Sequence, residues 1–135
     1  MRLSSRHFAR SEGGAAMVEF AIVLPILIMF FLGIVDFGRA FYLYNNLTNA
    51  VREGARLGAV QNPTVDVAAV QTRVTTRVKQ FTSNPTAAPS VTVSSTLQDV
   101  TVTITNYAFM PITPLPQAQG INMTVTAVFR RESAP

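Results

Sequence analysis

The most constraining feature of this chain is an apolar run from Ala15 to Val35, AAMVEFAIVLPILIMFFLGIV, in which Glu19 is the single charged residue. A helix of this length extends about 30 Å, which matches the hydrocarbon core of a bilayer. A buried helix in a small domain would not be apolar on every side. The run therefore predicts a membrane-spanning helix, and Pro25 inside it predicts a helix kink of the kind that membrane helices tolerate.

Charge on the two sides of the run predicts its orientation. The chain has a net charge of +4, and half of this excess lies in residues 1–14, which hold Arg2, Arg6, Arg10 and Glu12. A basic leader before an apolar run is retained in the cytoplasm, so the rest of the chain is expected outside. The remaining residues have little net charge and no basic patch interleaved with aromatic residues, which argues against a nucleic-acid partner.

The composition also excludes most enzyme classes. The 135 residues allow one small domain, and without Cys there is no disulfide, thiolate metal site or thiol nucleophile. The single His, His7, lies in the leader. The acidic residues after the run are scattered: Asp36, Glu53, Asp66, Asp99 and Glu132. We expect no enzyme, no metal, no cofactor and no small-molecule substrate.

The helix is predicted to continue beyond the membrane. Apolar and small residues recur at spacings of three and four and form one stripe: Ala40, Leu43, Tyr44, Leu47, Ala50, Val51, Gly54, Leu57 and Gly58. The pattern predicts one helix from about Met17 to Ala59. The chain then divides into a leader (1–14), a transmembrane segment (15–35) and an extracytoplasmic domain (36–135) that includes the helix extension 36–60.

The rest of the domain combines one more helix with strands. A helix is predicted over Val65–Phe81, with Thr64 as its N-cap and a stop at Ser83-Asn84-Pro85. Period-two alternation then predicts three strands, around 91–94, 100–105 and 121–129, with Leu97-Gln98-Asp99 closing a hairpin and a proline-rich loop over 111–120. The expected fold class is α+β, with a long N-terminal transmembrane helix, a second helix and a three-stranded antiparallel sheet.

Glu19 needs an explanation, because a carboxylate inside an apolar run is costly and is a functional candidate by default. It follows Gly14 by five positions and precedes Phe20, an order that resembles the signal of type IV prepilins and pseudopilins. Further matches resemble the TadE-like family of minor pilins and pseudopilins of the Flp, or tight adherence, system: Gly14 to Ala21, Leu24-Pro25, Gly33-Ile34, Phe37-Gly38-Arg39 and Ala50 to Arg56. Phe20 departs from the Glu-Tyr pair that is common in the Flp branch.

The resemblance implies a function and a set of partners. A prepilin peptidase would cut between Gly14 and Ala15, and Glu19, with Phe20 beside it, would then lie one helical turn from the new amine of Ala15 and pair with it. The chain would be anchored in the inner membrane with a small pilin-like domain outside it, and would join a pilus used for adhesion or secretion. Its partners would be membrane lipid, the peptidase, other pilin subunits and inner-membrane platform proteins.

Some features keep two interpretations. The segment Arg52-Glu53-Gly54-Ala55-Arg56 resembles a family motif, and Arg52, Glu53 and Arg56 form either a subunit contact or a solvated charged face. Gly54 and Gly58 permit either close approach of another helix or close packing within the same chain.

The function also keeps two alternatives. The chain could be an unprocessed single-pass membrane protein with a small external binding domain. It could instead be a secreted protein cut after the weak site Gly38-Arg39-Ala40.

Overall fold

The computed structural model describes residues 12–61, 64–82, 89–113 and 120–131. Its elements are helices α1 (Glu12–Ala59) and α2 (Val67–Phe81) and strands β1 (Ser90–Ser95), β2 (Asp99–Phe109) and β3 (Ile121–Arg130). The strands form one antiparallel sheet in the order β1-β2-β3. The predicted α+β fold is confirmed. The basic residues of the leader, the predicted stop after α2 and residues 114–119 of the proline-rich loop lie outside the described residues.

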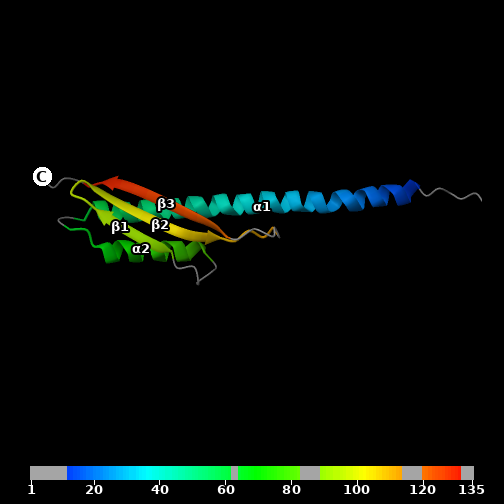
Figure 1. The fold of residues 1–135 in the computed structure, drawn as a ribbon. Helices are drawn as coiled ribbons and strands as arrows, with labels where there is room; N and C mark the ends of the chain where they lie inside the picture. Colours follow the sequence, from blue (N-terminus) through cyan, green and yellow to red (C-terminus); the bar gives the residue numbers. More distant parts are fainter. Residues whose placement is uncertain (1–11, 62–63, 83–88, 114–119, 132–135) are drawn as a thin grey trace, which may run out of the picture.

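Helix α1 has two halves with different surroundings. Figure 1 shows that its C-terminal half lies along the sheet while its N-terminal half projects beyond the domain. The buried stripe of the C-terminal half repeats every three or four residues and comprises Leu47, Ala50, Val51, Ala55 and Ala59. The helix begins at Glu12, before the predicted Met17, because Ala15 and Ala16 are strong helix formers and extend it towards the N-terminus.

Helix α2 begins later than predicted. Its N-cap is Asp66, whose carboxylate accepts a hydrogen bond from the backbone N–H of Ala69 at 3.0 Å. The prediction of Thr64 as the cap is therefore wrong, and Val65 lies outside the helix. An Asp cap places a strong acceptor opposite the free N–H groups of the first turn. The helix turns Val70, Val74 and Val78 into the core.

Strand β2 is longer than the alternation predicts, because a bulge interrupts it. Ile104 pairs with Val125 and Tyr107 pairs with Met123, so two residues of β2 stand opposite one of β3. One of these two, Asn106, has a φ of 54°. The inward positions therefore change from even numbers up to Ile104 to odd numbers at Tyr107 and beyond. Sequence alternation ends at that change, although the strand continues to Phe109.

The core depends on two glycines of α1. A Cβ atom on Gly54 would lie 2.3 Å from Cγ2 of Val74, and one on Gly58 would lie 2.9 Å from Cγ1 of Val100. The two glycines let the backbone of α1 approach both α2 and β2. Of the two interpretations, close packing within the chain is confirmed.

Candidate functional site

The N-terminal half of α1 presents an extended apolar surface from Ala15 to Val35, in which Glu19 is the one charged residue. Large exposed side chains cover all its sides: Met17, Val18, Phe20, Ile22, Val23, Ile26, Leu27, Ile28, Met29, Phe30, Phe31, Ile34 and Val35. The helix from Gly14 to Ala59 is long and apolar enough to cross a membrane. The most apolar stretch of 18 residues within it has no buried residues. Water does not solvate such a surface well, so it requires lipid or apolar neighbours.

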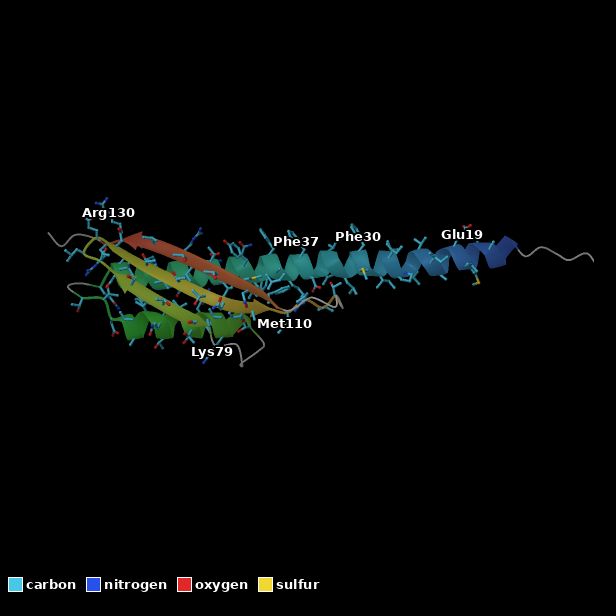
Figure 2. The ribbon with its side chains drawn as sticks, in the orientation of Figure 1. Glu19, Phe30, Phe37, Lys79, Met110 and Arg130 are labelled. Atoms are coloured by element: carbon cyan, nitrogen blue, oxygen red, sulfur yellow. The ribbon has the colours of Figure 1, made fainter. Side chains whose placement is uncertain are left out.

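The residues predicted to be processed lie in the first turns of this helix. Gly14, Ala15, Glu19 and Phe20 are all exposed, and Figure 2 shows Glu19 near the free end of α1. Residues four apart lie one above the other on a helix, so Glu19 is on the face of Ala15. Among the described residues, no hydrogen bond or ion pair is assigned to Glu19, and its carboxylate is available to a partner outside them.

Pro25 lies inside α1, which continues from Glu12 to Ala59. The N–H that proline lacks leaves one carbonyl of the preceding turn without its helical partner. The predicted kink stays a prediction.

Asp36 is a functional candidate that we did not predict. It ends the apolar run and is 7% exposed. Its carboxylate accepts hydrogen bonds from the backbone N–H of Ile112 at 2.8 Å and of Thr113 at 2.7 Å, and from the Thr113 hydroxyl. It thus fixes the segment that follows β2 onto α1. The sequence contains one sign of this site, namely that Asp36 is the first charge after the run.

The charge of Asp36 is well compensated. The Thr113 hydroxyl, the Ile112 and Thr113 N–H groups and Arg39 together lower the pKa of Asp36 from 3.8 to about 2, against the opposing effect of burial. Arg39 lies 3.1 Å from Asp36 and 5.5 Å above the ring of Phe109. The carboxylate is therefore ionised at neutral pH and holds the Arg39 side chain close to the end of β2.

The charges of the segment from Arg52 to Arg56 do not form a single cluster. Glu53 binds Arg73 of α2 at 2.8 Å and Arg77 at 3.4 Å. Arg52 lies in a hollow beside β3, whereas Arg56 lines another hollow together with Arg73. Glu53 thus links α1 to α2 within the chain, while Arg52 and Arg56 are exposed. A subunit contact through these residues stays a prediction.

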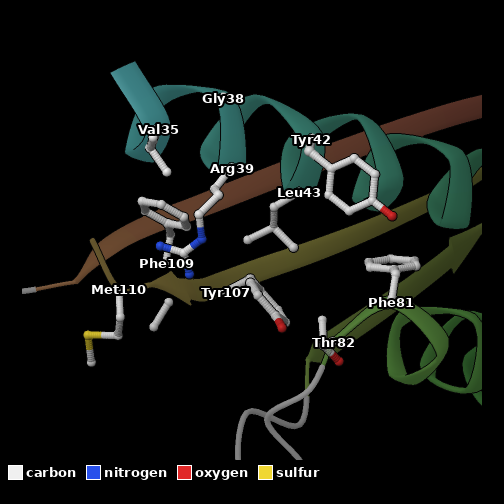
Figure 3. Close-up of a pocket in the computed structure, with 11 residues that line it drawn as sticks. Val35, Gly38, Arg39, Tyr42, Leu43, Phe81, Thr82, Tyr107, Phe109 and Met110 are labelled. Carbon is white, nitrogen blue, oxygen red and sulfur yellow. The ribbon is translucent and has the colours of Figure 1, made fainter. Parts of the chain in front are cut away.

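A groove of about 650 Å³ lies between α1, the end of α2 and the end of β2. Figure 3 shows Tyr42, Phe81 and Tyr107 around it. Arg39 is the one charged residue of its lining, and it is paired with Asp36. The lining offers no acid–base pair, and the described residues contain no group of three or more His, Asp or Glu that could hold a metal.

Helix α1 is exposed and apolar in its N-terminal half and packs against a small sheet in its C-terminal half. This arrangement is compatible with a single-pass membrane protein. Comparison with family models finds one similarity: residues 14–56 match the model described as TadE-like protein. The match covers the exposed apolar half of α1 and most of its buried stripe. It confirms the resemblance to the TadE-like family over this segment.

The TadE-like family is associated with pili of the Flp, or tight adherence, type, and the match to it covers less than half of the chain. Enzymatic activity is not known for the family. The comparisons found no match to the chain among curated proteins or among solved structures.

Proposed function

We propose that this chain is a TadE-like minor pilin or pseudopilin that a prepilin peptidase cuts after Gly14 and that takes part in assembly of a Flp-type pilus for adhesion or secretion. The observation that carries the proposal is the division of α1. Its C-terminal half completes the core of the domain, and its N-terminal half leaves most of its large apolar side chains exposed. This arrangement suits a subunit that is anchored in lipid first and packed against other such helices later.

The proposal gives Glu19 a role. Cleavage between Gly14 and Ala15 creates an amine with a positive charge one helical turn from the Glu19 carboxylate. In an apolar environment, the pair is favoured over either charge alone. The amine of the same or of a neighbouring subunit can be the partner, and this would fix the axial register of packed helices.

The proposed location is the inner membrane, with the N-terminus in the cytoplasm and the domain outside, followed by incorporation into a surface pilus. The charge asymmetry around residues 15–35 supports this orientation. The proposed partners are membrane lipid, the prepilin peptidase, other pilin or pseudopilin subunits and inner-membrane platform proteins.

The test is the intact mass and N-terminal sequence of the protein extracted from membranes, with and without the peptidase. We expect a start at Ala15 that depends on the peptidase. Gly14→Val should block cleavage, whereas Gly13→Val, the matched control one residue earlier, should still be cut. A start at Met1 in the presence of the peptidase would overturn the proposal in favour of an unprocessed membrane protein, and a start at Phe41 would indicate secretion.

A further inference from the structure

The segment that follows β2 runs beside the membrane end of α1. Met110 lines the groove that contains Val35 and Gly38, and Thr113 lines an adjacent hollow together with Gly33, Ile34 and Phe37. Figure 2 shows Met110 level with Phe37 along the helix. The end of the domain therefore reaches the last turn of the apolar run.

The exposed side chains of this segment are apolar. Met110 is 63% exposed and Ile112 is 55% exposed, and Phe37 beside them is 75% exposed. They continue the exposed apolar surface of α1 without a break. Two charges lie close to this segment, Asp36 and Arg39, and they are paired with each other. Charged residues such as Arg130 lie at the other end of the sheet.

Backbone N–H groups of the segment also have hydrogen-bond partners within the protein, as a site with little water requires. Within the hydrocarbon region of a bilayer, irregular backbone is tolerated only where its polar groups find partners within the protein. The N–H groups of Ile112 and Thr113 and the Thr113 hydroxyl all donate to the Asp36 carboxylate. One side chain of α1 thus satisfies the donors of two consecutive loop residues.

We propose that residues 110–113 enter the boundary between headgroups and acyl chains of the bilayer that α1 crosses, with Met110 and Ile112 inserted and Asp36 holding the segment against the helix. The domain would then contact the membrane at two points, α1 and this segment. This inference rests on the proposed membrane anchoring of α1. The occupant is lipid because the apolar surface is continuous with that of the proposed span.

The experiment uses the absence of Trp from the chain. Single-Trp variants of the full chain are reconstituted into phosphatidylcholine vesicles whose acyl chains carry bromine close to the headgroup. Ile112→Trp and Met110→Trp report on the segment, and Phe30→Trp reports on the span. Leu97→Trp is the matched control, because Leu97 is 94% exposed in the hairpin between β1 and β2.

We expect brominated lipid to cause a loss of fluorescence for Ile112→Trp, Met110→Trp and Phe30→Trp, and none for Leu97→Trp. Acrylamide in the aqueous phase should quench the fluorescence of Leu97→Trp strongly and that of the other three variants only weakly. Adding Asp36→Ala to Ile112→Trp should shift its fluorescence towards the behaviour of Leu97→Trp, with the helical circular dichroism unchanged.

Two negative outcomes are distinguishable. If Phe30→Trp responds to brominated lipid while Ile112→Trp and Met110→Trp respond only to acrylamide, the inference about the segment is wrong and the membrane anchor stands. If Phe30→Trp also responds only to acrylamide, α1 does not span the bilayer, and both the anchor and this inference are overturned.

Discussion

Asp36 and Thr113 are 77 positions apart in the chain, yet the backbone N–H of Thr113 lies 2.7 Å from a carboxylate oxygen of Asp36. The contact ties the last turn of the apolar run to the segment that leaves the sheet. It therefore connects the exposed apolar half of α1 with the part of the chain that forms the folded domain.

The pKa of Asp36 predicts a specific acid sensitivity. Its folded-state pKa of about 2 is below the ordinary value of 3.8, so between these values the unfolded chain binds more protons than the folded one. The contribution of Asp36 to stability is therefore complete above about pH 4 and is lost as the pH falls towards 2. Denaturant midpoints of the full chain in detergent micelles at a series of pH values measure this loss.

Asp36→Asn should reduce the slope of stability against pH in this acid range. The matched control is Asp99→Asn, which removes a carboxylate at the far end of the sheet and should leave the contribution of Asp36 in place. An unchanged slope in Asp36→Asn would contradict the assigned hydrogen bonds.

Gly54→Ala should destabilise the domain. The added Cβ would lie 2.3 Å from Cγ2 of Val74, and valine is stiff about χ1. Overpacking a core costs about 1–3 kcal/mol, which exceeds the gain of roughly 1 kcal/mol for Ala over Gly in a helix. Gly38→Ala is the control, because nothing lies within 4 Å of its added Cβ. Denaturant midpoints should fall for Gly54→Ala and stay equal or rise for Gly38→Ala.

Asn106 is expected to tolerate Gly but not Val. Its φ of 54° is in the left-handed region, which Asn and Gly adopt more readily than β-branched residues. Asn106→Val should lower the free energy of unfolding by about 1–3 kcal/mol. Thr105→Val, one residue earlier, has no such requirement and should change stability little. Equal stability of the two valine variants would contradict the bulge.

Glu19→Gln should impair assembly without blocking cleavage. The uncharged side chain can no longer neutralise the amine at Ala15, so the processed subunit should be recovered mainly in membranes rather than in sheared pili. Glu12→Gln is a matched control, since it also removes one acidic charge but lies in the leader that the proposed cleavage would remove. Quantitative immunoblots of the two fractions decide the matter, and wild-type recovery of Glu19→Gln in pili would refute the pairing.

The charges near residue 54 should separate into two roles. Glu53→Ala removes two partly exposed ion pairs to α2, and such pairs contribute about 0–1 kcal/mol each to stability. Arg52→Ala and Arg56→Ala remove no ion pair found among the described residues and should leave thermal unfolding unchanged. If Arg52 or Arg56 forms a subunit contact, its variant should be recovered less with pili. Normal recovery of both variants with pili would support the alternative interpretation, in which these residues form a solvated charged face.

Much of the fold could be predicted, because the patterns that determine it are local. The exposed run around Phe30 is apolar on all sides, and the buried stripe that includes Leu47 repeats at helical spacing. The strands around Val93, Val102 and Val125 alternate between a buried and an open face. Each pattern needs only neighbours in the sequence.

The remaining features depend on contacts that are distant in the sequence or on competition between neighbouring residues. Asp36 meets Ile112 and Thr113 only after the sheet has folded back along α1, and no local pattern encodes that meeting. The end of β2 was missed because the bulge at Asn106 reverses the alternation. Asp66, and not Thr64, is the N-cap of α2, because its carboxylate lies within hydrogen-bond distance of the backbone N–H of Ala69.

Helix α1 continues without a break at Asp36 from its exposed half to its packed half. No flexible linker therefore separates the exposed half from the domain. Torque applied to one half is transmitted to the other. If the exposed N-terminal half tilts or rotates about its axis, the sheet rotates with it through the same angle, because the two halves belong to one continuous helix. In the proposed anchored and assembled states, the orientation of the outer surface of the sheet is therefore set by the packing around the exposed half of α1.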